Sequence, residues 1–463
     1  MTKVAFHNLG CKVNAYEMEY MQQMFTKCGY EIVPFAKKAD IYIVNTCTVT
    51  NIADRKSRQM LHRAKKMNPE SIVVATGCYV QTDTGDAKRD ESIDLLVGNN
   101  RKKEIVSLVE AFMEKRKEQS AAEHAQFVPD MTLETEYEEF KLEQIGEHTR
   151  AYIKIQDGCN QFCSYCIIPY ARGRVRSRKA EDVLTEIRGL AERGYQEVVL
   201  TGIHLSSYGL DFHKNAEEKA VSYNGAAAAG SFTNTDLISL IEQIEQIKGI
   251  RRIRLGSLEP RIITEEFLER LFVLTKFCPH FHLSLQSGSD TVLKRMNRQY
   301  SAGEYYEKTE LIRQYFEHPA LTTDVIAGFP GETEEEFEET RAYLEKVNFY
   351  EVHVFKYSRR HGTAADRMPG QLTEKEKAVR SGLLIEEAAK RSRQYREWYV
   401  NRPLEVLFEE TQEIEDAVYQ VGYTKEYVKA AAAGEADLNN RIISGRALGM
   451  LTDEILVFSG NLE

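Results

Sequence analysis

Short apolar runs alternate with amphipathic stretches through the first part of the chain. The run IYIVNT at 41–46 is typical of a parallel strand that is buried on both faces. Met18, Met21 and Phe25 recur at the spacing that lines one face of a helix. The pattern predicts strands at 4–10, 41–46, 71–77 and 93–98, and helices at 14–29, 52–67 and 101–118. Because strands alternate with helices, we expect residues 1–118 to form an open, doubly wound α/β domain.

A second α/β series follows a polar segment. Residues 119–147 are acidic and aperiodic, so we expect a linker that crosses the surface. From 148 to 370, strands are expected at 152–156, 197–202, 252–256, 280–286, 321–329 and 352–357. Six strand–helix units in roughly 230 residues suit a partial (β/α)6 barrel better than a complete eight-unit barrel. Residues 210–236 are rich in Gly, Ala, Ser and Asn, and they are expected to form a surface insertion.

The periodicity changes again toward the C-terminus. Residues 371–399 are charged and helical in pattern, which predicts a connector. Residues 400–463 contain short alternating runs that are separated by Gly, Asn and Asp. Such runs are typical of a small antiparallel β-barrel.

Composition is that of a globular protein with sizeable cores. The chain has 463 residues, a net charge of −10 and 42% hydrophobic residues. No apolar run approaches the ~20 residues of a membrane-spanning helix, and polar residues come too early for a secretory signal. We therefore expect a cytoplasmic protein without membrane contact. Eight cysteines are too few for a disulfide scaffold in so long a chain, so clustered cysteines indicate metal ligands or catalytic groups.

The most specific local pattern is the loop triplet, formed by Cys159, Cys163 and Cys166 directly after an expected strand. Three thiolates can hold three irons of a [4Fe–4S] cluster. Because such clusters ordinarily use four cysteines, one iron would stay open to a ligand. The alternative is a zinc site, but zinc prefers four ligands in two separated pairs, and no second pair is present.

Three further cysteines share a position rather than a spacing. Cys11, Cys47 and Cys78, here called the edge cysteines, each follow directly after an expected strand. The carboxyl ends of parallel strands meet at one edge of a sheet, so three thiols can converge there on a second cluster. The alternative is three separate small buried hydrophobes. Cys28 and Cys278 are expected to be structural.

Several motifs occur in fixed order over nearly the whole chain. They are LGCKVNAYE (9–17), NTCTVT (45–50), GCYVQ (77–81), DGCNQFCSYCIIPYARGRVRSR (157–178), TGIHLSSYG (201–209), LGSLEP (255–260), HLSLQSGSDTVLKRMNR (282–298), TDVIAGFPGETEEEF (323–337) and FKYSRRHGTAA (355–365). With these motifs the chain resembles the methylthiotransferase family of radical S-adenosylmethionine enzymes. VGYTKEYVKA (421–430) is similar to the RNA-binding β-barrel domain of that family, which implies a TRAM-like domain at 400–463.

The resemblance implies two [4Fe–4S] clusters and S-adenosyl-L-methionine as cofactors. The loop triplet would hold the cluster that binds and reductively cleaves S-adenosylmethionine, and the edge cysteines an auxiliary cluster that supplies the methylthio group. The resulting radical would take hydrogen from carbon 2 of an adenine. A low-potential electron donor of the flavodoxin or ferredoxin type would be a partner.

Tyr165, which lies between two cysteines of the loop triplet, and residues at later strand ends are implied as contacts of S-adenosylmethionine. The strand-end residues are Ser257, Glu259, Ser284, Gln286, Ile326 and Gly328. Tyr165 is expected to pack on the cofactor, and Gly328 to permit close approach of the backbone to a bound adenine. For the polar members, the alternative is that they form strand-end turns.

The family's subgroups act on different substrates. One modifies N6-threonylcarbamoyladenosine beside the tRNA anticodon, one N6-isopentenyladenosine at the same position, and one an aspartate of a ribosomal protein. CKVN, NTCTVT and YSRRHGT are similar to the first subgroup, and His204 supports the same choice. We therefore expect methylthiolation of N6-threonylcarbamoyladenosine, with the other two substrates as alternatives. A non-catalytic iron–sulfur RNA-binding protein is the alternative of a different class.

Basic stretches after strand ends are the candidate contacts with tRNA, and no DNA partner is expected. The candidates are Arg172, Arg174, Arg176, Arg178, Arg359, Arg360, Tyr423 and Lys429. Phosphates need positive counter-charges, and tyrosines can stack on bases. Residues 55–66 form either a further basic contact or a solvated helix face. His7, His204 and His361 could serve as acid–base groups, with structural roles as the alternative.

Overall fold

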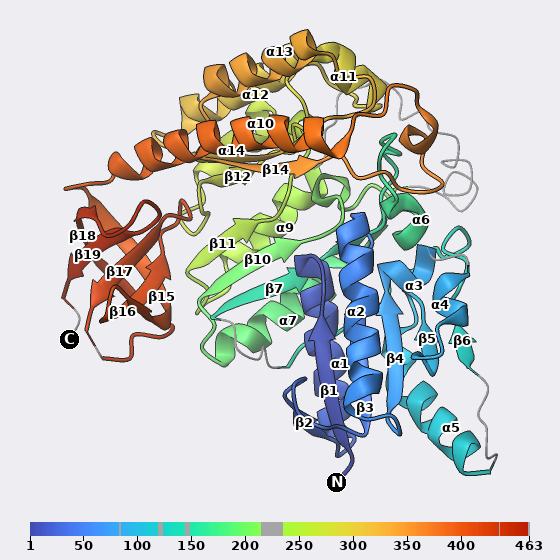
Figure 1. The fold of residues 1–463 in the computed structure, drawn as a ribbon. Coiled ribbons are helices and arrows are strands. Elements are labelled where there is room, and N and C mark those ends of the chain that lie inside the picture. The colour runs from blue at the N-terminus through green and yellow to red at the C-terminus, as the bar shows by residue number, and fades with distance from the viewer. Residues whose placement is uncertain (83–84, 119–123, 144–148, 214–234, 435, 462–463) are drawn as a thin grey trace.

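The computed structural model describes residues 1–82, 85–118, 124–143, 149–213, 235–434 and 436–461. The chain runs from an N-terminal sheet through a central curved barrel to a small C-terminal β ring (Figure 1). Among the helices of these ranges, none combines the length and the apolar run that crossing a bilayer requires.

The N-terminal domain is a parallel sheet with the strand order β2-β1-β3-β4-β5-β6. Its strands are β1 (Lys3–Asn8), β2 (Glu31–Val33), β3 (Ile41–Thr46), β4 (Ile72–Gly77), β5 (Leu95–Val97) and β6 (Ala125–Phe127). Its helices are α1 (Lys12–Lys27), α2 (Asn51–Met67), α3 (Cys78–Thr82), α4 (Asp86–Arg89), η1 (Lys102–Glu104) and α5 (Ile105–Glu118). The strands expected at 41–46 and 71–77 agree with β3 and β4, and the short β2 was not expected.

Helices cover both faces of this sheet. On one face, Met18, Met21 and Phe25 of α1 pack with Val109 and Phe112 of α5 against the strands. On the other face, the core includes residues of α2 and α3. Because apolar side chains leave the sheet in both directions, β3 and β4 are buried along their whole length. The doubly wound arrangement expected from the alternation of strands and helices is therefore present.

The segment expected to be a surface linker is partly built into the fold. Its residues Ala125–Phe127 form β6, which pairs with β5 at the edge of the N-terminal sheet. Further on, Phe140 and Leu142 are buried in the core of the following domain, and the Tyr16 hydroxyl donates to the Phe140 carbonyl at 3.1 Å. The interpretation as a linker on the surface is wrong for these residues, because a polar average concealed a few apolar anchors.

The central domain holds two parallel sheets, β11-β10-β7 and β12-β13-β14. Its strands are β7 (Arg150–Lys154), β8 (Gln156–Asp157), β9 (Arg176–Ser177), β10 (Glu197–Thr201), β11 (Arg252–Leu255), β12 (His280–His282), β13 (Ala320–Ala327) and β14 (Glu351–Lys356). Single parallel bridges, Ile253 to Phe277 and Leu258 to Leu283, join the two sheets. The six parallel strands therefore form an open barrel, in the order in which the sequence predicted them.

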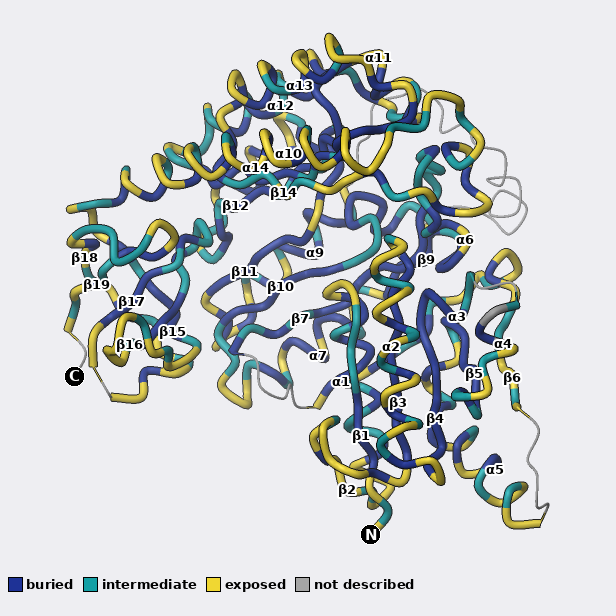
Figure 2. Tube along the Cα trace, viewed as in Figure 1, coloured by how far each residue is buried: buried dark blue, intermediate teal, exposed yellow. Residues whose placement is uncertain are grey.

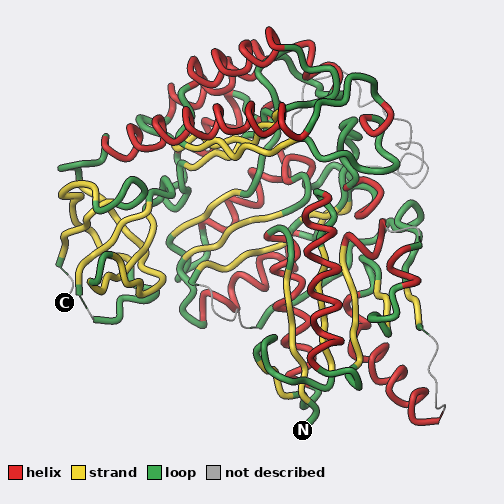
Figure 3. The backbone as a smooth tube through the Cα atoms, viewed as in Figure 1, coloured by secondary structure: helices red, strands yellow, loops and turns green. Residues whose placement is uncertain are grey.

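Helices pack on the outside of this barrel, where the largest core of the protein lies (Figure 3). The helices of the central domain are α6 (Ile168–Arg172), α7 (Ala180–Glu192), η2 (Leu205–Ser207), α9 (Thr235–Glu245), η3 (Pro260–Ile262), α10 (Glu265–Phe272), α11 (Asp290–Arg295), α12 (Ala302–Tyr315), α13 (Glu334–Val347) and η4 (Ala365–Arg367), and all but α6 and η4 contribute to this core. Most of the insertion expected at 210–236 lies outside the described residues.

The C-terminal part begins with the long helix α14 (Glu374–Glu397), which Thr373 and Glu376 start with a capping box. A closed ring follows, in the order β15-β16-β17-β19-β18. Its strands are β15 (Pro403–Ile414), β16 (Ala417–Tyr423), β17 (Lys429–Ala433), β18 (Ile442–Met450) and β19 (Leu456–Gly460). The expected barrel is present, but it is mixed rather than antiparallel, because β17 and β19 pair in parallel to close it. Figure 2 shows buried, intermediate and exposed residues mixed along its strands, as expected where one face of each strand points into a small ring.

Candidate active site

The edge cysteines follow three neighbouring strands of the N-terminal sheet. Thr46 of β3 pairs with Gly77 of β4, so Cys47 and Cys78 leave the sheet side by side. A Cβ placed on Gly10 would lie 3.2 Å from the Cys47 sulfur, which brings the chain at Cys11 against the same point. Burial raises the pKa of Cys47 to about 11, and the adjacent thiols of Cys78 and Cys11 act in the same direction. The structure thus gathers these thiols at one edge of the sheet.

The loop triplet lies just after β8, at the corresponding edge of the barrel. Burial and then the Cys163 thiol raise the pKa of Cys159 to about 12. Burial, Cys163 and Cys159 also raise the pKa of Cys166. The three thiols are therefore close enough to act on one another electrostatically.

The loop that carries this triplet is fixed to the end of α11. The Ser164 amide donates to the Met296 carbonyl at 3.0 Å, and the Asn297 side-chain amide donates to the Phe162 carbonyl at 3.1 Å. Phe162 has a φ of 47°, in the left-handed region that non-glycine residues rarely adopt. These two hydrogen bonds hold the loop in a conformation that local preferences alone would not select.

One arginine donates to a thiol in each set. Arg298 Nη1 lies 3.3 Å from the Cys163 sulfur, and Arg172 Nε lies 3.4 Å from the Cys78 sulfur. A nearby positive charge favours the thiolate, which is the form that binds metal. Hydrogen bonds to cluster sulfurs also tune reduction potential. The sequence analysis missed Arg298, and it placed Arg172 on RNA.

The short helix α6 joins the two cysteine sets. It follows the loop triplet, and its Arg172 also donates to Glu17 and to the Asn14 side chain, each at 2.6 Å. The Asn99 side-chain amide donates to the Ala171 carbonyl at 2.8 Å. Because Asn14, Glu17 and Asn99 belong to the N-terminal domain, α6 docks the barrel against the edge that carries Cys78.

A buried cluster of charges surrounds this contact. Glu17 pairs with Lys102, Lys154 and Arg172, and Asp157 pairs with Lys154 at 2.6 Å. Burial by itself would raise the pKa of Glu17, but the three cations outweigh it and hold that pKa well below the ordinary value. Burial opposes the same change at Asp157, where Lys154 and Arg172 lower the pKa to about 2. Both carboxylates are therefore charged at neutral pH.

A second contact between the domains lies near Cys47. Arg360 is 8% exposed, and its guanidinium contacts Asp54 at 2.7 Å and the Thr48 hydroxyl at 2.6 Å. The Asn51 amide donates to the Ser358 hydroxyl at 2.9 Å. The loop after β14 is thus fixed to the start of α2, and the expectation that Arg360 contacts RNA is wrong, because its charge is used in this contact.

Three more of the basic residues expected on RNA are buried. Arg172 and Arg176 are 1% exposed and Arg178 is fully buried. Arg178 pairs with Glu186 and with Glu139. Since these guanidiniums are enclosed by protein, their interpretation as phosphate contacts is wrong. Two of the carboxylates that enclose them, Glu17 and Glu139, lie 155 and 39 residues from their arginine partners, and the basic run itself does not reveal them.

The other RNA candidates reach solvent. Arg174 lies over the Phe162 ring at 4.3 Å and is partly exposed, and Arg359 is exposed with an ion pair to Asp366. On the C-terminal ring, Tyr423 and Lys429 are partly exposed. The aromatic side chain of Tyr423 also lies 4.9 Å from the Arg150 guanidinium of β7. This contact attaches the C-terminal β ring to the barrel.

Apart from Tyr165, which lies in the loop between β8 and α6, the expected contacts of S-adenosylmethionine lie at or just after the carboxyl ends of the barrel strands. Tyr165 packs beside a small core that contains Phe329, Ser257 is exposed, and Ser284 is partly exposed. Gln286 has a φ of 78°, and its carbonyl accepts from the Ile326 amide at 2.9 Å. This pairing brings the backbones of two of the expected contacts together.

Gly328 has a structural role of its own. Its φ is 75°, and a Cβ there would lie 2.5 Å from Cγ of Lys377. Lys377 belongs to α14, so this glycine allows the long helix to approach the barrel. The expectation that it makes room for an adenine is not tested by this contact.

The residues present fit the groups that the resemblance implies. All six thiols of the two sets are free. Glu259 Oε2 and His204 Nε2 are buried without a hydrogen-bond partner in the described part of the chain. Burial lowers the pKa of His204 to about 3, so its ring is neutral. A carboxylate oxygen and a neutral ring nitrogen that lack partners are available to the hydroxyl or amino groups of a ligand.

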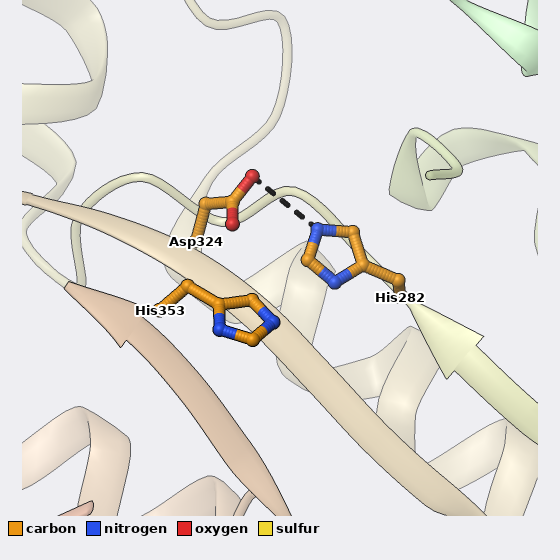
Figure 4. Close-up of side chains that lie close together, drawn as sticks. All are labelled: His282, Asp324 and His353. Carbon is orange, nitrogen blue, oxygen red and sulfur yellow. Dashed lines mark ion pairs between the residues drawn. The ribbon is translucent and has the colours of Figure 1, made fainter. Parts of the chain in front are cut away.

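The barrel also carries polar residues that sequence reasoning missed. His282, Asp324 and His353 come from β12, β13 and β14, and their ligand atoms lie within 4.8 Å of one another (Figure 4). Their positions, two residues before Ser284, Ile326 and Phe355, repeat the alternation of a strand. This two-residue spacing could have identified His282 and Asp324 from the sequence, because it places them on the same strand face as the expected cofactor contacts Ser284 and Ile326.

Comparison with known proteins first defines the class. Residues 153–344 match the radical SAM superfamily, and residues 3–98 match the uncharacterized protein family UPF0004. In fold, the chain is similar to the radical S-adenosylmethionine methyltransferase TsrM from Kitasatospora setae, with a TM-score of 0.56 at 15% sequence identity. That likeness covers 79% of this chain and 77% of the other.

Full-length relatives define the family within this class. The chain is 39% identical to threonylcarbamoyladenosine tRNA methylthiotransferase MtaB of Bacillus subtilis, over 97% of this chain and 94% of that relative. It is 37% identical to the protein of the same name from Aquifex aeolicus, over 88% and 92%. It is 32% identical to a tRNA-2-methylthio-N(6)-dimethylallyladenosine synthase of Pelotomaculum thermopropionicum, over 100% and 92%. The chain belongs to the methylthiotransferase family of radical SAM enzymes.

Proposed function

We propose that this enzyme transfers a methylthio group to carbon 2 of N6-threonylcarbamoyladenosine at position 37 of tRNA, giving 2-methylthio-N6-threonylcarbamoyladenosine. Four relatives named for the threonylcarbamoyl substrate are 34–39% identical to the chain. The observation that carries the proposal is the contact of α6, the helix that directly follows the loop triplet, with the sheet edge that carries Cys78. Methylthiolation of an unactivated C–H bond needs a radical source and a sulfur source within one site, and this arrangement provides a place for both.

The loop triplet and the edge cysteines would each hold a [4Fe–4S] cluster, with S-adenosylmethionine at the first. When bound, these groups supply a carbon-centred radical and a methylated sulfur. The remaining chemistry belongs to the protein. Arg298 and Arg172 donate to one thiol of each set. Tyr165, Ser257, Glu259, Ser284, Gln286, Ile326 and Gly328 would position the cofactor.

We propose a division of the chain along the same lines. Residues 1–118 would hold the auxiliary cluster, 148–370 would form a partial (β/α)6 radical SAM core, and 400–463 a TRAM-like tRNA-binding barrel. The segments 119–147 and 371–399 connect them. Arg174, Arg359, Tyr423 and Lys429 remain the proposed tRNA contacts. A flavodoxin- or ferredoxin-type donor would supply electrons.

Mass spectrometry of tRNA nucleosides tests this function. Cells that lack this activity should regain the 2-methylthio form of the threonylcarbamoyl nucleoside when they express the chain. If only the 2-methylthio isopentenyl nucleoside returned, the substrate assignment would be wrong. If neither returned and the anaerobically reconstituted protein made no 5′-deoxyadenosine, the chain would be a non-catalytic binding protein. Modification of a ribosomal-protein aspartate alone would select the third alternative.

A further inference from the structure

The strands of the second barrel sheet have two faces of opposite character. Phe281, Leu283 and Val325 belong to the large apolar core between strands and helices, and Val352 and Val354 pack against it. Successive side chains of a strand point to opposite faces. The residues between them therefore lie on the inner face of the barrel.

That inner face carries His282, Asp324 and His353 (Figure 4). His282 and Asp324 are partly exposed and His353 is exposed, so solvent reaches them. His282 Nε2 lies 3.3 Å from an Asp324 oxygen, and its Nδ1 lies 3.0 Å from the Thr322 hydroxyl. The rings of His282 and His353 stack with centroids 5.7 Å apart. The three side chains thus form a cluster of polar residues, held by contacts with one another, on a surface that solvent reaches.

A cation from the other domain reaches the same face. Lys12 directly follows Cys11, is exposed, and holds its ammonium 5.9 Å from the ring centroid of Tyr152 on β7. Tyr152 lies between the core residues Ala151 and Ile153, which places it on the inner face. Within the described residues, Lys12 forms no ion pair. An ammonium beside the auxiliary site is therefore available to an anion.

Lys12 and the histidines share one electrostatic environment. Burial is the main cause of the lowered pKa of His280, and the charges of Arg254, His282, Lys12 and His353 contribute to it. Packing links the same strands. His280, two residues before His282 on β12, stacks on the Tyr427 ring with centroids 5.1 Å apart, and Arg150, two residues before Tyr152 on β7, lies 4.9 Å from that ring. Because residues two apart on a strand share a face, Lys12 and the polar side chains on β12–β14 lie over the same inner face of the barrel.

We propose that Lys12, His282, Asp324 and His353 form the subsite that receives the threonylcarbamoyl substituent of the target adenosine. The inference rests on the proposed function and adds the residues that select the substrate. The substituent carries a carboxylate, a hydroxyl and a urea-type amide. The ammonium of Lys12 pairs with the carboxylate, and the Asp324 carboxylate and the imidazoles exchange hydrogen bonds with the hydroxyl and the amide.

The same group of residues disfavours an isopentenyl substituent. That substituent is apolar, so binding it here would remove water from Lys12 and Asp324 without giving either a partner. An unpaired charge or buried polar group is costly, and sites built for polar groups reject analogues that lack them. Phe355, which is 47% exposed and pairs with Ile326 two residues beyond His353, offers the adenine an aromatic surface on the same face.

Binding of four anticodon stem-loops to the anaerobically reconstituted enzyme tests the subsite. The loops carry, at position 37, the threonylcarbamoyl nucleoside, its neutral methyl ester, the isopentenyl nucleoside or plain adenosine. The wild type should bind the acid about tenfold more tightly than the ester, as expected for one charge-assisted contact. Lys12→Met should abolish most of this preference and leave affinity for the ester unchanged, and Lys12→Arg should retain it.

Two controls keep the result specific. Lys38→Met changes an exposed lysine that precedes β3, at the opposite end of the sheet from Cys47, and should keep the full preference. Because Lys12 adjoins a cysteine, the iron content of its variants is measured alongside.

His353→Phe, on β14, should reduce the preference for the threonylcarbamoyl loop over the isopentenyl loop at least about fivefold with unchanged iron.

Several results would overturn the subsite. Unchanged acid preference in Lys12→Met, or unchanged substrate preference in His353→Phe, would do so. So would stoichiometric zinc or manganese in the wild type that His353→Ala removes, since the group would then be a metal site. If the wild type methylthiolates only the isopentenyl loop, the proposed function fails. If it methylthiolates the threonylcarbamoyl loop without preferring the acid, the subsite alone fails.

Discussion

The two sets of thiols in this enzyme are held in place by different parts of the structure. The loop triplet is fixed to the end of α11 through Ser164 and Asn297, whereas the edge cysteines depend on the N-terminal sheet. Each set is therefore held by its own local structure. Removing one ligand should leave the other set intact.

Cys163→Ala should abolish reductive cleavage of S-adenosylmethionine and lower bound iron by about half, because three-thiolate coordination needs all three cysteines. Iron analysis and chromatographic measurement of 5′-deoxyadenosine check both effects. Cys28→Ala is the matched control, since that cysteine is exposed and belongs to neither set. Retained cleavage in Cys163→Ala would show that the ligand assignment is wrong.

Arg172 has a larger structural role than its place in a basic run suggests. It is 1% exposed and neutralises Glu17 and Asp157 as well as contacting Cys78. Arg172→Met should lower the free energy of unfolding by about 3–5 kcal/mol, because it leaves buried carboxylates with too few cations. Arg188→Met, an exposed arginine of α7, should change it by less than about 0.5 kcal/mol.

Urea denaturation at neutral pH measures both variants. Equal stability of Arg172→Met and wild type would contradict the assignment of α6 as the structural link between the cysteine sets.

At the scale of elements, the alternation of apolar runs predicted most of the fold. β3, β4 and the barrel strands lie where it placed them, because buried parallel strands leave continuous apolar runs. The position of the edge cysteines followed from the same pattern. β6 and the parallel pairing of β17 with β19 did not follow, because a three-residue edge strand and a pairing direction leave no periodic signal.

The candidate site was only partly predictable for the same reason. Cysteines directly after strands and the loop triplet stand out in the sequence, and their gathering follows from sheet topology. Partners such as Glu17 with Arg172, or Asp54 with Arg360, join segments far apart in the chain. Nothing in a single basic run distinguishes an internal ion pair from a phosphate contact.

The junction of α14 with the barrel should be sensitive to acid. His318 stacks on Trp398 at 3.9 Å and on Tyr395 at 4.2 Å. Burial is the main cause that lowers the pKa of His318 from 6.5 to about 4. Between these values the unfolded chain binds a proton that the folded protein does not, so stability falls as pH decreases through this window.

His318→Phe should keep the stacking and remove that loss. Relative to wild type, the variant should gain about 1 kcal/mol of stability on going from pH 7 to pH 5, after allowance for partial solvent exposure. Thermal unfolding at both pH values measures the difference. A constant difference between the two proteins would contradict the assigned pKa shift.

At the scale of the whole molecule, an acidic protein must present local positive charge to tRNA. Four of the arginines expected on tRNA are enclosed by protein. The exposed residues Arg55 and Lys56 of α2 are therefore stronger candidates for tRNA contact, because α2 begins just after Cys47. The double change Arg55→Ala and Lys56→Ala should weaken tRNA binding about equally for all sequences. It should also reduce the slope of log affinity against log salt by about 2.

Filter binding at several salt concentrations checks this prediction. Lys115→Ala with Lys117→Ala, in α5 where the helix points away from the cysteine edge, is the matched pair that should change neither quantity. If the slope of log affinity against log salt were unchanged in the α2 variant, Arg55 and Lys56 would not contact tRNA, and that helix face would only be exposed to solvent.

The central claim is that two separate thiol sets serve one reaction on one tRNA nucleoside. A single anaerobic assay of Cys47→Ala with a threonylcarbamoyl stem-loop tests it most directly, with 5′-deoxyadenosine and the 2-methylthio nucleoside measured together. We predict that the variant still forms 5′-deoxyadenosine but no methylthiolated product, whereas the wild type forms both. Methylthiolated product from Cys47→Ala at the wild-type level would contradict the account.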